Sequence, residues 1–77
     1  MEPINKGESV VFDNDQEYVA VEVLIDNGQK YVYLAKDGEN PEVILGKEII
    51  EDGEVIIETL DNNEEIERIL KLIVGKI

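Results

Sequence analysis

The sequence contains no cysteine, no histidine and no tryptophan. Without cysteine, neither a disulfide nor a thiolate zinc site can support the fold. Nucleophiles are scarce, because Ser9 and Thr59 are the only aliphatic hydroxyls, and no glycine-rich phosphate loop follows a predicted strand. A pair of carboxylates is available for hydrolysis, but 77 residues leave little chain to build a substrate cleft. We therefore expect a protein that is not an enzyme and that holds no cofactor and no metal.

Long hydrophobic runs are also missing, and none approaches the length of a membrane span. The first residues lack the basic region and apolar stretch of a signal peptide, so we expect a cytoplasmic protein without membrane contact. Residues 1–7, which include Pro3 and Gly7, are predicted to be a flexible lead-in with little to bury. Residues 8–77 are predicted to form one small domain that is stabilised by aliphatic packing.

Positive charge is scarce: 19 acidic residues stand against 7 basic ones, which gives a formal net charge of −12. Such a surface repels nucleic acid and anionic membranes, and it attracts basic partners. One interpretation is that the acids keep a small sheet soluble and monomeric. The alternative is an acidic inhibitor or nucleic-acid mimic that binds a basic protein. Its acidic surface would consist of Glu42, Glu48, Glu51, Asp52, Glu54 and Glu58.

Two runs of alternating residues, 17–26 and 29–36, flank the pair Asn27-Gly28. This pair favours a two-residue type I′ turn, because both central residues of that turn need positive φ. The turn predicts three cross-strand pairs: Asp26 with Gln29, Val23 with Val32, and Val21 with Leu34. The valines then share one face, and we expect that face to be the core face.

The opposite face of this hairpin carries tyrosine. A tyrosine side chain combines a large apolar area with a polar tip, and it is enriched in protein interfaces. One interpretation is therefore a partner-binding surface that consists of Tyr18, Leu24, Tyr31 and Tyr33. The other is that these side chains stabilise a solvated sheet face, or that the sheet curls and buries them.

Three more strands are expected, at residues 8–12, 43–50 and 54–60, with a polar turn at residues 13–16 before the central hairpin. Gly46 interrupts the second of these strands, which predicts a bulge or a close approach of another backbone. A turn at Asp52-Gly53 predicts three further pairs: Ile49 with Ile56, Lys47 with Glu58, and Leu45 with Leu60.

The last segment has a helical period. Its apolar stripe consists of Ile66, Ile69, Leu70, Ile73, Val74 and Ile77. Asp61, Asn62 or Asn63 could cap the start of this helix. We therefore predict an α+β fold, with a five-stranded antiparallel sheet made of two hairpins and a leading strand. One C-terminal amphipathic helix is expected to pack on its apolar face.

Five stretches of the chain are an acidic turn, two hairpin segments, a strand start and an acidic helix start. In chain order they are Asp13-Asn14-Asp15, Asn27 to Leu34, Glu42 to Leu45, Glu51 to Glu54 and Asp61 to Glu65. In these features the chain resembles the YrzB-like family of small acidic bacterial proteins of unknown function, over about residues 8–72. The resemblance implies a bacterial cytoplasmic protein without an assigned activity. The whole sequence predicts a small acidic domain that serves as a protein-interaction or regulatory module.

Overall fold

The computed structural model describes residues 3–12 and 15–76, which form five strands and one helix. The elements are β1 (Ser9–Val11), β2 (Glu17–Asp26), β3 (Gln29–Lys36), β4 (Glu42–Glu51), β5 (Glu54–Thr59) and α1 (Asn63–Lys76). Each strand pairs antiparallel with the next, in the spatial order β1-β2-β3-β4-β5. The predicted α+β fold is confirmed. The predicted turn at residues 13–16 includes Asp13 and Asn14, which lie outside the described residues.

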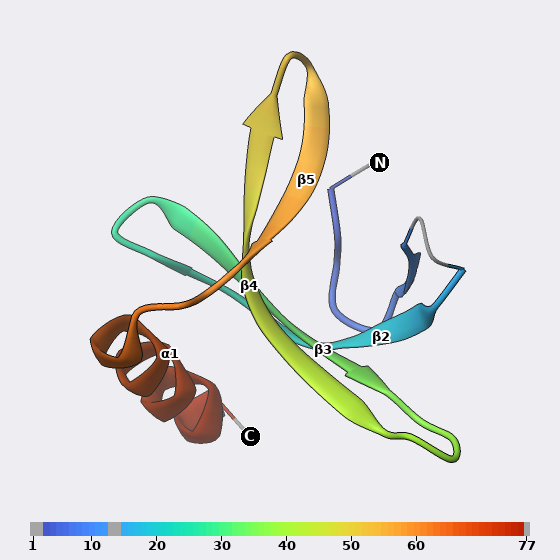
Figure 1. Ribbon diagram of the computed structural model, residues 1–77. Coiled ribbons are helices and arrows are strands. Elements are labelled where there is room, and N and C mark those ends of the chain that lie inside the picture. The colour runs from blue at the N-terminus through green and yellow to red at the C-terminus, as the bar shows by residue number, and fades with distance from the viewer. Residues whose placement is uncertain (1–2, 13–14, 77) are drawn as a thin grey trace.

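The sheet is curled and separates two hydrophobic clusters. α1 lies on one side of the sheet, and the segment before β1 lies on the other (Figure 1). The helix cluster, on the α1 side, consists of Leu24, Tyr31, Leu60, Ile69 and Ile73. The N-terminal cluster, on the other side, consists of Ile4, Val10, Tyr18, Ala20, Val32 and Leu34. β2 and β3 both contribute to the two clusters, and β3 has no exposed residue.

The Asn27-Gly28 turn sets the register of the central hairpin. Asn27 has a φ of 52° and Gly28 a φ of 77°, as a type I′ turn requires. Two of the predicted pairs next to this turn are confirmed: Asp26 with Gln29, and Val23 with Val32. The two-residue turn therefore determines the pairing of its half of the hairpin.

A bulge between Ala20 and Glu22 changes the burial of the first half of β2. The predicted pair of Val21 with Leu34 is wrong, because Ala20 lies opposite Leu34. A bulge adds one residue to one strand, so the alternation of side chains reverses beyond it. The prediction of a buried valine face is therefore wrong for Val19 and Val21, which are 43% and 37% exposed. Ile25 lies between the bulge and the turn and is 72% exposed, which the bulge does not explain.

The N-terminal segment is part of the packed fold. Ile4 is buried in the N-terminal cluster, and its backbone N–H donates a 2.9 Å hydrogen bond to Oε2 of Glu48. The N–H of Gly7 donates to the carbonyl oxygen of Ala20 at 2.8 Å. The prediction of a lead-in with little to bury is therefore wrong for Ile4, while residues 3 and 5–7 are exposed. A single isoleucine among polar residues has no periodicity that would reveal its burial.

The second hairpin follows the predicted register. The turn residues Asp52 and Gly53 both have positive φ, and the predicted pairs of Ile49 with Ile56 and Lys47 with Glu58 are confirmed. The predicted close approach at Gly46 is also confirmed. A Cβ atom there would lie 2.7 Å from Cγ2 of Ile57 and 3.0 Å from the carbonyl oxygen of Glu58. The pairing runs through Gly46 without a register shift.

Asn62 caps the helix, because its Oδ1 accepts a 3.0 Å hydrogen bond from the N–H of Glu65. Ile69 and Ile73 are buried, and Ile66 packs beside them. α1 covers the tyrosine face of the central hairpin, not the valine face that we expected it to cover. The predicted stripe is confirmed at Ile66, Ile69 and Ile73. Leu70 and Val74 are 38% and 71% exposed, and Ile77 lies outside the described residues. α1 has 14 residues, and no helix within the described part of the chain is long and apolar enough to cross a membrane.

Candidate functional site

Three of the four residues predicted for partner binding lie in the interior. Leu24 and Tyr31 are buried beneath α1, with 7% and 3% of their surface exposed. Tyr18 lies in the N-terminal cluster at 4% exposure, and its hydroxyl donates a 2.8 Å hydrogen bond to Oε2 of Glu42. This hydrogen bond, together with burial, raises the pKa of Tyr18. Tyr33 is half-buried, so it is the one member of the predicted set that reaches an open surface.

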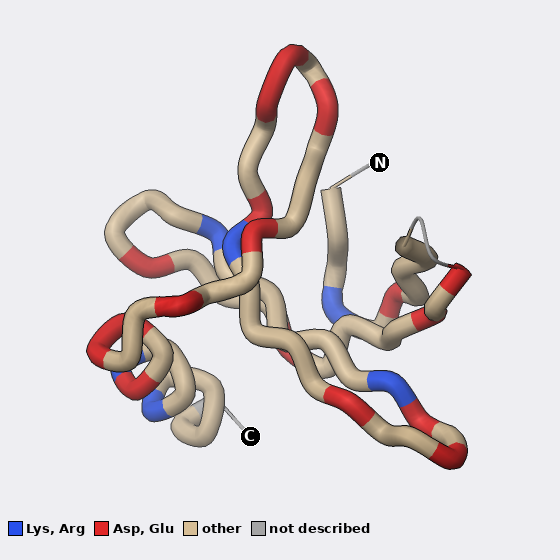
Figure 2. The backbone as a smooth tube through the Cα atoms, in the orientation of Figure 1, with Lys and Arg blue, Asp and Glu red and all other residues tan. Residues whose placement is uncertain are grey.

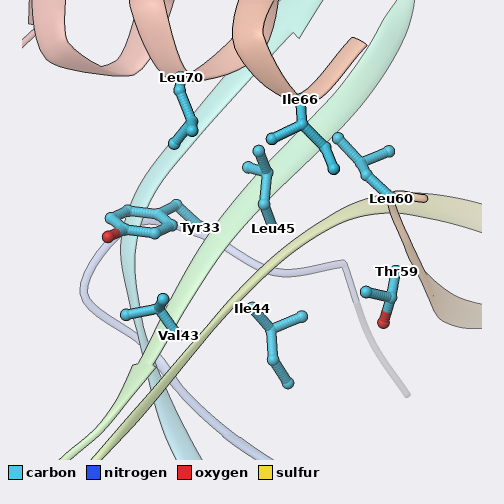
Figure 3. Close-up of a pocket in the computed structure, with 8 residues that line it drawn as sticks. All are labelled: Tyr33, Val43, Ile44, Leu45, Thr59, Leu60, Ile66 and Leu70. Atoms are coloured by element: carbon cyan, nitrogen blue, oxygen red, sulfur yellow. The ribbon is translucent and has the colours of Figure 1, made fainter. Parts of the chain in front are cut away.

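Tyr33 lines an apolar groove between α1 and the sheet (Figure 3). The groove has a volume of about 430 Å³. Its walls consist of Tyr33, Val43, Ile44, Leu45, Thr59, Leu60, Ile66 and Leu70. The helix contributes two of these side chains, which point down toward the strands in Figure 3. Val43 is 62% exposed and Leu70 is 38% exposed, so the groove opens to solvent at both residues.

The groove lies where β5 ends and β4 continues without it. Counting away from the β4–β5 turn, the last paired residues of the two strands are Gly46 and Thr59. One more hydrogen bond lies beyond this pair: the N–H of Leu60 donates to the carbonyl oxygen of Leu45 at 3.0 Å. Beyond Leu60 the chain turns away to the cap of α1, while β4 runs on toward its loop with β3 (Figure 1). In the described part of the chain, residues 42–44 therefore pair with β3 alone.

A polar network holds the first turn of α1 against the sheet. Oε2 of Glu65 accepts a 2.8 Å hydrogen bond from the Tyr31 hydroxyl and lies 3.2 Å from Nζ of Lys47. Arg68 donates to the same hydroxyl at 3.3 Å, and its Nε lies 3.2 Å from Oδ2 of Asp26. These contacts anchor α1, and with it the helical wall of the groove.

The pKa values in this network move away from neutral pH. The hydrogen bond from Tyr31, followed by the contact with Lys47, lowers the pKa of Glu65, although burial opposes this change. The hydrogen bond with Glu65 raises the pKa of Lys47. Burial, and then the hydrogen bond to Glu65, raises the pKa of Tyr31. A general acid or base needs a pKa near the working pH, so these directions are typical of a structural network.

The six acids of the predicted acidic surface lie in different environments. Glu48 is half-buried with a side chain that is 8% exposed, and its Oε2 lies 2.9 Å from Nζ of Lys30 and accepts the Ile4 N–H. Glu42 and Glu51 stand at opposite ends of β4, whose ten residues span up to about 30 Å. The acids of the β4–β5 turn gather at the hairpin tip (Figure 2), and they are Glu51, Asp52 and Glu54. The predicted set is therefore not one continuous surface.

Within residues 3–12 and 15–76, no three acidic side chains converge closely enough to hold a metal ion.

Sequence reasoning assigned most of the groove residues to the core. Leu70 belongs to the apolar helical stripe, which predicted burial, and Val43 was assigned only to a strand. One signal was present in the sequence. Because the predicted pairing of the second hairpin ends at Leu45 with Leu60, Val43 and Ile44 are left without a partner on that side.

Comparisons with known proteins identify no relative: no protein-family model, no curated protein and no solved structure matches this chain significantly.

Proposed function

We propose that this chain is a small, non-enzymatic protein-interaction module, and that the groove between α1 and strands β3–β5 binds a basic segment of its partner. The exposed apolar surface of the groove carries this proposal. Val43 and Leu70 leave a large part of their surface in water beside the half-buried ring of Tyr33. A contiguous apolar hollow on a small protein is the usual form of a binding site.

The charges around the groove support a basic partner. Four exposed acids are sequence neighbours of groove-lining residues: Glu42, Glu58, Asp61 and Glu67. Lys71, next to Leu70, is the corresponding basic residue. Complementary charge speeds encounter and suppresses wrong partners. A second copy of this chain also carries a formal net charge of −12, so like-charge repulsion disfavours it as the occupant.

We extend the proposal to the setting of the protein. The acidic composition, and the hairpin sequences that resemble those of the YrzB-like family, support a cytoplasmic bacterial protein that acts as a monomer. A regulatory role would follow if occupation of the groove controls the activity of the bound partner.

A peptide of defined sequence tests the groove. The probe is acetyl-Lys-Lys-Val-Leu-Val-Lys-Lys-amide, which combines an apolar centre with basic ends. We expect it to shift the amide signals of Tyr33, Leu45 and Leu70 in a nitrogen-15 NMR titration. Raising sodium chloride from about 0.05 M to about 0.3 M should weaken the binding, because salt screens the charges. A peptide with glutamate in place of each lysine is the charge control.

Two leucines of α1 provide matched variants. Leu70 and Leu72 are similarly exposed, at 38% and 42%, but only Leu70 lines the groove. Leu70→Gln should weaken peptide binding about five- to tenfold, since it removes apolar contact, whereas Leu72→Gln should leave the affinity within about twofold. Equal effects of the two substitutions would contradict the proposal.

The acidic-mimic alternative gives a different result in the same titration. It places the bound peptide at the hairpin tip, where Glu51, Asp52 and Glu54 are exposed. Shifts confined to that tip, with affinity lost in a Glu51→Gln, Glu54→Gln double variant and kept in Leu70→Gln, would replace the groove by the acidic tip as the binding surface.

A further inference from the structure

We propose further that the bound segment is extended, and that it pairs with the open edge of β4 as an additional strand opposite Val43. This inference rests on the proposed function. It adds the conformation of the partner segment and the backbone groups that hold it.

The first observation is the open backbone edge beside the groove. β4 has ten residues and β5 has six, and their pairing stops at Gly46 with Thr59. Residues 42–44 pair with β3 on one side. On the other side the described chain offers them no strand. An exposed strand edge is a template for the addition of an extended peptide.

The second observation is the direction of the backbone groups. The N–H of Leu60 donates to the carbonyl oxygen of Leu45, so the backbone groups of Leu45 point toward the β5 side. Alternate residues of a strand direct their N–H and C=O groups to the same side. The N–H and C=O of Val43 therefore point to the open side, and those of Ile44 point to β3. Val43 is 62% exposed, so an incoming backbone can reach it.

The third observation is that the groove extends around this edge. Tyr33, Ile66 and Leu70 line it on the α1 side of the sheet, while Ile44 and Thr59 line it next to the edge itself. Side chains of an extended peptide point alternately to the two faces of the sheet. An added strand would thus place one side chain against Leu70 and the next against Ile44. A helical segment could use the α1 side alone.

Charge identifies the chemistry of this strand. Glu42 stands at the start of the open edge, where its Oε2 accepts the Tyr18 hydroxyl, and Asp61 follows Leu60 at the other end; both residues are exposed. An extended partner with an apolar centre and basic ends matches this arrangement, as the peptide Lys-Lys-Val-Leu-Val-Lys-Lys does. A second β4 edge would instead bring another glutamate to the same place, and like charges across a strand pair are unfavourable.

Amide exchange with water tests the added strand directly. With the same acetylated and amidated peptide at saturation, exchange of the Val43 N–H should slow at least tenfold, because a new hydrogen bond protects it. The Ile44 N–H already faces β3, so its exchange should change less than about twofold, which makes it the internal control. Groove shifts at Tyr33 and Leu70 without slowing at Val43 would overturn the strand and leave the groove function intact. An absence of groove shifts would overturn both.

Methylation of the peptide backbone supplies a second test that needs no variant of the protein. N-methyl groups placed in turn on the central valine, leucine and valine block one amide each. A paired strand predicts an alternating result, in which amides that face β4 lose about tenfold in affinity and amides that face solvent lose little. A uniform effect along the peptide would contradict strand pairing.

Val43→Pro removes the outward donor and leaves the hydrogen bonds to β3 in place, and proline is tolerated on a strand edge with this orientation. We expect this variant to bind the peptide about tenfold more weakly than Val43→Ala, which keeps the N–H. Equal affinities of the two variants would count against the strand. If Val43→Pro does not fold, the methylated peptides decide the question alone.

Discussion

The hydroxyl of Tyr31, in the central strand β3, donates a 2.8 Å hydrogen bond to Oε2 of Glu65 in the first turn of α1. Tyr31 is 3% exposed, so this bond forms at the edge of the helix cluster, where water does not compete freely. Lys47 reaches the same carboxylate oxygen from β4 at 3.2 Å. One carboxylate therefore links two strands to the helix that forms a wall of the groove.

Tyr31→Phe should destabilise the protein by roughly 1–2 kcal/mol, because it leaves the Glu65 carboxylate without its hydroxyl donor while keeping the ring in the helix cluster. Urea unfolding followed by far-UV circular dichroism measures this change. Tyr33→Phe is the matched control, since Tyr33 lines the groove and is not part of this network. A larger loss in Tyr33→Phe would show that the Tyr31 hydroxyl is not what holds α1.

The stability of the protein should fall in acid partly through Glu65. The pKa of this carboxyl lies below its ordinary value of 4.5 in the folded protein, chiefly because Tyr31 donates a hydrogen bond to it. Such a group contributes stability that is fully present above the unfolded pKa and is lost as pH falls through the folded pKa. The stability difference between the wild type and Glu65→Gln should therefore be constant above about pH 5 and shrink below about pH 4.

Urea unfolding at a series of pH values and constant ionic strength measures this difference. Glu67→Gln, at an exposed position on the same helix, controls for the loss of one negative charge. A stability difference for Glu65→Gln that grows on acidification would contradict the predicted direction.

Gly46→Ala should destabilise the protein by roughly 1–3 kcal/mol, because the new methyl group meets backbone as well as side-chain atoms. Its Cβ would lie 3.0 Å from the carbonyl oxygen of Glu58. Gly75→Ala is the matched control, since a Cβ there meets no atom within 4 Å. In the last turn of α1, alanine should stabilise by a few tenths to about 1 kcal/mol. Thermal unfolding measures whether each variant melts below or above the wild type. A Gly46→Ala variant with an unchanged melting temperature would refute the close approach.

The hairpin tip should be destabilised by its own charge. Glu51 and Glu54 face each other across the turn, with Asp52 between them. Like charges in a cross-strand pair cost roughly 0.2–1 kcal/mol, and salt screens them. The Glu51→Gln, Glu54→Gln double variant should therefore melt at a higher temperature than the wild type in low salt. This rise in melting temperature should shrink in moderate sodium chloride. The control is Glu39→Gln in the β3–β4 loop, which should raise the melting temperature less. A gain that persists in high salt would have a cause other than charge repulsion.

Tyr33 is the one residue of the candidate site that the sequence analysis identified. In an ideally alternating hairpin, one face would carry all four residues predicted for partner binding: Tyr18, Leu24, Tyr31 and Tyr33. The bulge at Val21 moves Tyr18 to the opposite side, and α1 covers Leu24 and Tyr31. Tyr33 alone stays at an open surface. Its neighbour Leu70 belongs to the apolar helical stripe, which predicted burial, and Val43 was assigned only to a strand.

The sequence by itself determined the local features of the fold, which are the two turns, the strand pairs beside them and the buried stripe of the helix. Asn27-Gly28 and Asp52-Gly53 specify their turns because few residues accept positive φ, and each turn fixes the pairs beside it. The spacing of Ile69 and Ile73 likewise specifies the buried stripe of α1.

Only the tertiary structure decided which surfaces are covered. β3 is apolar on both faces, so its pattern does not say which face receives the helix and which receives Ile4. The bulge at Val21, the ion pair of Glu48 with Lys30 and the open edge at Val43 all depend on how the sheet curls and where β5 leaves it. These features depend on contacts between segments that are far apart in the chain, and local periodicity does not encode such contacts.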